Sequence, residues 1–556
     1  MRLGTRQSPF PPQQRKHPPH PRQSALPVGA AIVFAVLLAA CGGGSSGRGS
    51  APPQFGGISS DEPRATLAAR EILQLRGAAA DAAVALYFTL AVTMPSTAGL
   101  GGGGACLVYE PRFNRVEAFD FATRPVASGR TAAPTVARGM FAIQAKYGRL
   151  RWEQLLSPAE TLARFGAPVS RALATDLAAA APRLAEDPEA RRLFVRADGA
   201  MLAEGDNLVQ TDLAVLIAGL RARGAGEMHV GPLARRIAQG SAEIGSAMTQ
   251  AELEHALPTT RPTVVVRHEG FNLHFSPPPA IGGLSAAQLW AMIAGRWNRT
   301  DADERPQLLA AATLRAAADR PRWANADLSR VANLAELVSE RRAAELMTGY
   351  RADARAAPAQ FNPPPIPAKE FAPGASFVVA DRQGQTVACA VSLNGRFGLG
   401  RMVPGTGIFL AAPPEDGERG YQSLGAMIVI GRRGGGLFTP LETAGQMMMA
   451  AAGTGGAATA SALAGVALRS IVDRRPLEEA ISAPRVDYAS GADAVDVEAG
   501  AEALSRSLAA RGYPIQSVPA LGRVNAISCP DGINNDIESC QTRSDRRGFG
   551  LAVGGK

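Results

Sequence analysis

A chain that breaks acyl bonds without a metal needs a hydroxyl or thiol nucleophile with a base beside it. The serine–lysine pair of some hydrolases does not occur, because no serine stands three positions before any of the lysines, which are Lys16, Lys146, Lys369 and Lys556. Residues 43–47 spell Gly-x-Ser-x-Gly, but this stretch is Gly/Ser-rich and lacks the strand, turn and helix that the motif requires. No isolated nucleophile motif therefore identifies the chemistry.

The five cysteines are too few, in 556 residues, for a disulfide scaffold. Cys529 and Cys540 flank the turn-rich PDGINNDIES and are the natural disulfide pair, with a calcium loop as the less favoured reading of the same oxygen-rich segment. Cys106 and Cys389 lie in apolar runs, so we expect buried free thiols, with a second disulfide as the alternative. The histidines after residue 41 show no metal-ligand spacing, and we expect no metal and no cofactor.

The first forty residues have the features of a secretion leader. No Asp or Glu precedes Cys41, and the apolar run 25–40 is shorter than the roughly twenty residues of a membrane span. The ending Leu-Ala-Ala-Cys resembles the bacterial lipoprotein box, which implies cleavage before Cys41 and lipid on its sulfur. We expect a signal peptide at 1–40, a flexible tether at 41–58 and a membrane-anchored lipoprotein that faces the periplasm. A single-pass anchor and an ordinary signal peptide are the alternatives.

The charge of the chain argues against a nucleic-acid partner once the leader is set aside. The formal net charge is +9, from 58 basic and 49 acidic residues. Five of the basic residues lie in the leader, so 53 remain and the net charge of residues 41–556 is +4. A charge this small over more than 500 residues is no electrostatic footprint for nucleic acid.

The elements that must position any site follow from hydrophobic periodicity. Helical spacing covers residues 66–90 with a break at Gly77, and returns at 152–165, 170–184, 212–223 and 285–344. Strands are expected at 105–109 and 262–275 and on both sides of the turn at 383–384, and further helices at 440–450 and 457–472. Helices followed by sheet and again by helices predict a layered α/β sandwich and not a doubly wound parallel sheet.

Six of these segments, in order, resemble the gamma-glutamyltranspeptidase (gamma-glutamyltransferase) family: DAAVA, PSTAGLGGGGACLVYE, KYGRLRWEQLLSPAETLARFG, GASFVVADRQGQTVACAVSLN, AAGTGGAATA and SDRRGFGLAVG. The resemblance covers about residues 60–556. It implies the fold of the N-terminal nucleophile hydrolases, an αββα four-layer sandwich. It also implies a large-subunit-like part at 59–373, a small-subunit-like part at 374–556, and transfer or hydrolysis of the γ-glutamyl group of glutathione-like compounds.

The resemblance fails at the residue that should do the chemistry. Family members cut themselves before a threonine, whose hydroxyl then attacks the γ-glutamyl carbonyl while its freed amine acts as base. That position holds Gly374, which has no side chain. Ser376 is the nearest hydroxyl and the weak alternative nucleophile, but two residues along a strand displace it by roughly 6–7 Å. We expect Ser376 to be an ordinary strand residue.

Of the other positions that match the family, some keep its functional residues and some do not. Ser392 and Asn394 match the family's supporting Thr and Asn, and Gly455 and Gly456 match the pair whose N–H groups hold the oxyanion, although a tight turn alone also explains them. Gln422-Ser423 replaces the family's two adjacent serines, which bind the α-carboxylate of the substrate. The clamping arginine becomes Ala122, and Arg124 could replace it only with a rearranged loop.

The sequence thus predicts a periplasmic lipoprotein of this family that is catalytically degenerate and uncleaved. Its partners would be γ-glutamyl small molecules and the membrane reached through lipid on Cys41. Two alternatives remain: a non-catalytic binding or scaffolding lipoprotein, and an active enzyme that uses Ser376.

Overall fold

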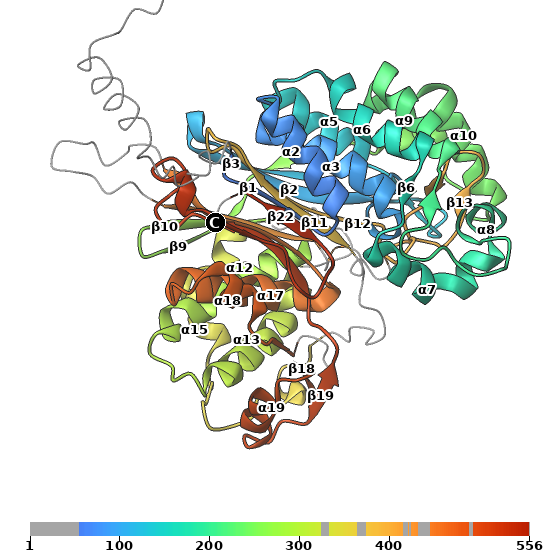
Figure 1. Ribbon diagram of the computed structural model, residues 1–556. Coiled ribbons are helices and arrows are strands. Elements are labelled where there is room, and N and C mark those ends of the chain that lie inside the picture. The colour runs from blue at the N-terminus through green and yellow to red at the C-terminus, as the bar shows by residue number, and fades with distance from the viewer. Residues whose placement is uncertain are drawn as a thin grey trace, which may run out of the picture. The chain divides into compact units, whose positions relative to one another are not determined.

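Two antiparallel sheets lie face to face at the centre of the protein (Figure 1). The structure, a computed structural model, describes residues 55–323, 333–363, 374–414, 421, 424–431, 445–488 and 493–554, all within the unit Pro53–Lys556. Cys41 and the predicted leader lie outside the described residues, as do Gln422 and Ser423. Within the described ranges, no helix combines the length and apolar character that crossing a membrane requires.

The first sheet has seven strands, and the segments that form it come from both ends of the chain. Its order is β22 (Leu551–Val553), β1 (Gly57–Ser60), β11 (Ala375–Ala380), β12 (Thr386–Ser392), β2 (Gly103–Glu110), β3 (Arg115–Phe121) and β8 (Thr259–Arg261). The second sheet has six strands, in the order β21 (Gln541–Arg543), β20 (Arg523–Ser528), β16 (Gln446–Thr454), β15 (Gly425–Gly431), β10 (Phe271–Phe275) and β9 (Val264–His268).

Helices cover the outer face of each sheet (Figure 1). Over the first sheet pack α2 (Pro63–Gln74), α3 (Ala79–Thr93), α5 (Val136–Tyr147), α6 (Trp152–Phe165) and α9 (Thr211–Arg223). Against the second pack α12 (Ile281–Trp297), α13 (Arg305–Asp319), α17 (Thr459–Ala467) and α18 (Leu477–Ser482). The predicted αββα four-layer sandwich is confirmed.

Smaller elements extend the helical layers. The helices are α4 (Pro95–Ala98), α7 (Arg171–Glu186), α8 (Pro188–Phe194), α10 (Gly231–Glu243), α11 (Gln250–His255), α14 (Leu334–Leu337), α15 (Glu340–Leu346) and α19 (Glu502–Ala509). The short strands are β4 (Arg124–Pro125), β5 (Ala132–Ala133), β6 (Ala167–Pro168), β7 (Asn207–Leu208), β13 (Met402–Val403), β14 (Ile408–Phe409), β17 (Val486–Asp487), β18 (Val495–Glu498) and β19 (Ile515–Val518).

Successive side chains of β11 point alternately to the two faces of the first sheet. Phe377 and Val379 pack in the helical core, whereas Val378 and Ala380 pack in the core between the sheets. Ser376 and Gly374 share the parity of the second pair. Both positions therefore face the second sheet.

Three expectations from the sequence are wrong. The tether does not extend to residue 58, because β1 begins at Gly57 and the fully buried Ile58 pairs with Val379 and Val553. Residues 446–450 are not helical but belong to β16, whose backbone is bonded on both sides, to β15 and β20. Cys106 and Cys389 are not free thiols: they stand opposite each other on β2 and β12 and form a disulfide. Cys529 and Cys540 form another.

Candidate functional site

Gly374 lies at the start of β11, buried between the ends of the two sheets. A Cβ added to it would lie 3.0 Å from Thr454 Cγ2, 3.0 Å from the Val391 carbonyl oxygen and 3.2 Å from Thr454 Cβ. Arg523 Nη2 donates a 2.8 Å hydrogen bond to the Gly374 carbonyl. The side chain of Thr454, the last residue of β16, therefore packs closely against this position and would have to shift by a few tenths of an ångström to admit a side chain at 374.

Ser376 is fully buried and belongs to a polar cluster between the sheets. Its Oγ accepts from Asn525 Nδ2 at 2.9 Å, and its backbone N–H donates to Asp61 Oδ2 at 2.9 Å. Asn525 also donates to Asp61 Oδ1, and Ser59 Oγ donates to Asn525 Oδ1 at 2.7 Å. These bonds join β1, β11 and β20, which gives Ser376 a structural part and keeps its hydroxyl away from solvent.

Ser392 and Asn394 lie together at the end of β12. The Asn394 N–H donates to Ser392 Oγ at 2.9 Å, and Asn394 Nδ2 donates to Thr123 Oγ1 at 3.0 Å and to the Ala412 carbonyl at 2.8 Å. Tyr421 donates its hydroxyl to the Thr123 carbonyl at 3.0 Å, and burial raises the pKa of Tyr421 to about 12. This tyrosine is a hydrogen-bond donor at neutral pH and not a base.

Gly455 and Gly456 form a turn between β16 and α17, with φ values of 132° and 63°. A Cβ at Gly455 would lie 2.5 Å from Gly522 Cα, so the turn packs backbone against backbone. Both the left-handed conformation and the close approach require glycine here. The turn alone accounts for these glycines, and their use as oxyanion donors stays a prediction.

Replacing Gly455 with alanine is expected to lower the free energy of unfolding by about 2–4 kcal/mol, because the new methyl group meets the backbone of Gly522 and the φ is strained. Chemical denaturation of the purified chain measures this. The matched control is Gly295→Ala in α12, where a Cβ would have no neighbour within 4 Å, and stability there should stay level or rise by up to about 1 kcal/mol. Equal stability of the two variants would contradict the tight packing of the turn.

The guanidinium of Arg124 is not free to bind a substrate carboxylate. Its Nη2 lies 3.2 Å from Asp120 Oδ2, and Arg261 Nε binds the same oxygen at 3.1 Å. Ala122, at the family's clamp position, is buried and apolar. Arg124 therefore forms an ion pair with Asp120, near the end of β3.

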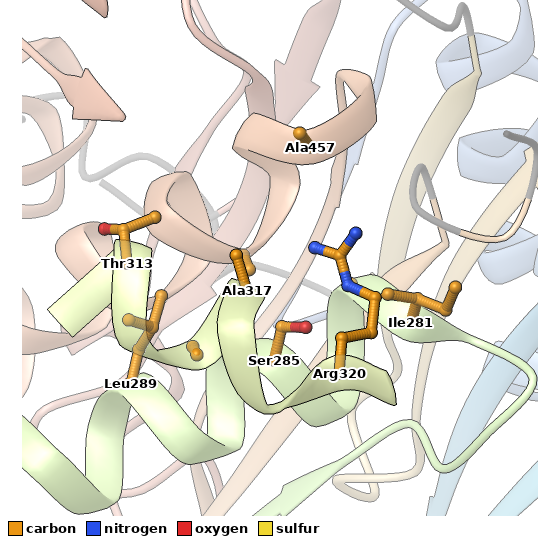
Figure 2. Close-up of a pocket in the computed structure, with 10 residues that line it drawn as sticks. Ile281, Ser285, Leu289, Thr313, Ala317, Arg320 and Ala457 are labelled. Carbon is orange, nitrogen blue, oxygen red and sulfur yellow. The ribbon is translucent and has the colours of Figure 1, made fainter. Parts of the chain in front are cut away.

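A cavity lies behind the glycine turn, between α12, the end of α13 and the segment 456–460 (Figure 2). Its volume is about 10 Å³, which is about enough for one water molecule, and small apolar side chains such as Ala457 and Ala460 line most of it. Figure 2 shows the Arg320 guanidinium and the Ser285 hydroxyl at one side of it. Ser285 Oγ is buried and has no hydrogen bond among the described residues.

The described residues around Gly374 include hydroxyl groups but no metal-binding cluster. In the part of the chain that the structure describes, no three His, Cys, Asp or Glu side chains gather so as to hold a metal ion. Thr454, whose side chain packs against Gly374, is fully buried, and its Oγ1 makes no hydrogen bond within the described residues. Without a base beside it, such a hydroxyl is a weak nucleophile.

Sequence reasoning missed four residues that the structure places around Gly374 and Ser376: Asp61, Thr454, Arg523 and Asn525. Only Thr454 carried a local signal, since it directly precedes the Gly455-Gly456 pair. The other three come from β20 and from the residue after β1, and only the pairing of the sheets brings them to β11.

Comparisons with known proteins agree with this architecture. The family model for gamma-glutamyltranspeptidase matches residues 65–554. The chain is 26% identical over 402 residues to the glutathione hydrolase proenzyme of Bacillus subtilis (strain 168), which covers 64% of this chain and 67% of that protein. It is 28% identical over 532 residues to the acylase ACY 1 proenzyme of Pseudomonas sp. (strain V22), with 86% and 90% covered.

A solved structure extends the comparison to the fold. The cephalosporin acylase from Bacillus halodurans superposes with a TM-score of 0.77 at 20% identity, covering 92% of this chain and 98% of that one. At this identity the likeness concerns the fold alone. It spans both helical layers and both sheets, as the coverage requires.

Proposed function

The chain belongs to the gamma-glutamyltranspeptidase family, and we propose that it is a member that neither cuts itself nor transfers acyl groups. We also propose that it is a lipoprotein, held to a membrane through Cys41 and facing the periplasm. The observation that carries the first proposal is Gly374, whose missing side chain leaves no oxygen to attack a carbonyl. Relatives of this chain are named as proenzymes, whereas this chain would remain in one piece.

The packing at Gly374 supports the proposal beyond the substitution itself. A Cβ at position 374 would lie 3.0 Å from the methyl carbon of Thr454, which is tighter than most Cβ contacts, and Arg523 binds the Gly374 carbonyl. A side chain at this position would require Thr454 to shift. The surroundings are therefore fitted to glycine.

An enzyme that uses Ser376 is the less favoured alternative. A substrate would have to reach a hydroxyl that is fully buried between the two sheets and bonded to Asn525. Such access would require β1, β11 and β20 to separate, since all three contribute to this cluster.

We expect the purified mature chain to run as one band on a denaturing gel and to release no product from a γ-glutamyl anilide above the blank. Intact mass spectrometry of the same sample would give the mass of residues 41–556 increased by lipid. Spontaneous splitting near residue 374, with anilide release that Ser376→Ala abolishes, would overturn the proposal. A family member that keeps its threonine is the positive control.

A second candidate function is the binding of a small ligand without catalysis. The residues that favour it are Ser392, Asn394 and the turn at Gly455, which together keep a polar wall beside Gly374. The same sample serves to examine this, because glutathione or glutamate that binds the folded state must raise its melting temperature. No rise with either compound counts against such a ligand.

A further inference from the structure

The end of the first sheet opposite Gly374 carries several basic side chains. β11 runs from Ala375 to Ala380, so Gly374 and Ala380 are about 20 Å apart. At the far end lie the start of β1, the turn between β2 and β3, and the turn between β11 and β12; the two turns lie side by side in Figure 1. We call this region the basic end and define it by Arg76, Arg112, Arg115, Lys146, Arg149 and Arg382.

Two adjoining clefts mark the basic end. Phe55, Leu73, Arg76 and Arg382 line the first, which has a volume of about 220 Å³. Arg112, Phe113, Arg115 and Lys146 line the second, of about 160 Å³. Arg149 borders both clefts, so they form one continuous surface.

The cations of the basic end point to solvent while their acidic partners are covered. The side chain of Arg112 is 68% exposed and that of Arg115 53%, whereas their partners Glu110 and Glu117 are 8% and 13% exposed. Asp381, the partner of Arg149, is 2% exposed, and the backbone N–H groups of residues 79, 383 and 385 bind it as well. In these three ion pairs the cation is therefore the more exposed partner.

Exposed acidic residues border this surface: Glu71 lies four residues before Leu75, and Glu153 lies four residues after Arg149. Asp531, Asp536 and Glu538 are exposed on the disulfide-closed loop between β20 and β21. Asn534 of that loop donates to the Gln383 carbonyl at 3.3 Å, so the loop borders the β11–β12 turn. The basic end thus stops at the second sheet.

Two large apolar side chains project from the same end. Leu75 is 68% exposed beside Arg76, and Phe113 is 73% exposed beside Arg112. Exposed apolar side chains interleaved with arginine are the composition that contacts the boundary between lipid headgroups and acyl chains. Basic residues close to an anionic membrane add electrostatic attraction to this apolar contact.

The course of the chain selects a membrane as the partner of this surface. Phe55 lines the first cleft, so the chain enters the fold at the basic end. Cys41 precedes Phe55 by fourteen residues, which span at most about 50 Å. Lipid on Cys41, as proposed above, would place a membrane within reach of the end at which the chain enters the fold.

We propose that the basic end is a docking face for a membrane surface that contains anionic phospholipid. Docking there turns the opposite end of the sheet, with Gly374 and the glycine turn, away from the lipid. The proposal goes beyond the proposed function, and it uses the lipid anchor only to choose a membrane as the occupant.

The experiment places an environment-sensitive fluorophore at the docking face of the full mature chain. Leu75→Cys is labelled with nitrobenzoxadiazole, and Phe165→Cys is the control, since Phe165 is 72% exposed at the end of α6 near the other end of the sheet. In vesicles of phosphatidylcholine with phosphatidylglycerol, emission from position 75 should rise about twofold and fall back in high salt. Emission from position 165 should not change.

Charge reversal provides the second readout. Arg76→Glu with Arg382→Glu should abolish the rise at position 75, whereas Arg171→Glu with Arg192→Glu, which reverses two cations that are each 63% exposed elsewhere, should leave it intact. A rise of equal size at position 165, no rise at 75, or a rise that survives the first reversal would overturn the docking face. The intact mass of the sample reports the lipid on Cys41 separately, so failure of the anchor and failure of the docking face are distinguishable.

Discussion

The double variant Gly374→Thr with Thr454→Ala is expected to cut itself before residue 374, whereas the parent chain stays whole. The new hydroxyl would attack the carbonyl of residue 373 and form an ester, which frees the amine of residue 374. Water then hydrolyses the ester and separates the two parts. The substitution at 374 supplies the missing oxygen, and the one at 454 makes room for it.

The need for both changes follows from the distances at Gly374. With Thr454 in place, a Cβ at 374 already lies 3.0 Å from its methyl group, and a threonine would add two more heavy atoms. Overpacking of this kind costs about 1–3 kcal/mol and moves side chains out of position. We therefore expect Gly374→Thr alone to be less stable than the parent and to split little or not at all.

A denaturing gel and the intact masses of the products measure the splitting. Gly374→Ala with Thr454→Ala is the matched control, because it adds the same Cβ without a hydroxyl and should remain one chain. Release of a γ-glutamyl anilide should stay weak even in the variant that splits. Ala122 has no guanidinium and Arg124 is paired with Asp120, so neither can bind the substrate carboxylate in a bidentate way. A double variant that melts like the parent and yet stays whole would show that more than Gly374 and Thr454 is missing.

Much of the fold was predictable because local patterns and tertiary packing agree in the helical layers. The helix predicted at 152–165 is α6 to the residue, since its apolar face repeats at helical spacing and packs on α3. β16 shows the opposite case. Its methionines and alanines favour a helix by intrinsic propensity. The segment is nevertheless a strand, because it pairs with β15 on one side and β20 on the other.

The site was less predictable because its contacts cross between sheets. Gly374 could be recognised by its place in the sequence pattern, but the close packing of Thr454 against it depends on how two sheets stack. The disulfide between Cys106 and Cys389 depends on strand register, which places those two residues opposite each other across 283 positions of sequence. Neither fact has a local signature that a pattern could report.

The largest expected loss of stability comes from Asp545. It is buried and lies 2.6 Å from Arg485 Nη2 and 3.1 Å from Arg547 Nη1, and it also accepts from the Val524 N–H at 2.9 Å. Arg485 in turn donates to the Gly522 carbonyl at 2.9 Å. The cluster thus holds Gly522, the residue against which the Gly455 turn packs.

Asp545→Ala is expected to lower the free energy of unfolding by about 3–5 kcal/mol, because it leaves the Arg485 guanidinium, 5% exposed, without its counter-charge. Chemical denaturation at neutral pH measures the loss. Asp353→Ala is the control: that carboxylate is 73% exposed and pairs with an exposed Arg351, so its removal should cost less than about 1 kcal/mol. Similar losses in the two variants would contradict the buried cluster.

The same cluster affects how the free energy of unfolding falls at acidic pH. Burial pushes the pKa of Asp545 upward, but the charges of Arg485 and Arg547 outweigh burial and hold that pKa below its ordinary value. A lowered pKa stabilises the folded state above the ordinary aspartate pKa, and this contribution disappears as the pH falls through the folded-state pKa. Asp545→Asn should therefore flatten the fall in stability between neutral and acidic pH, as well as lowering stability at pH 7. If the parent and this variant lost stability in parallel on acidification, the ionised form of Asp545 would not be what holds Gly522 and the glycine turn in place.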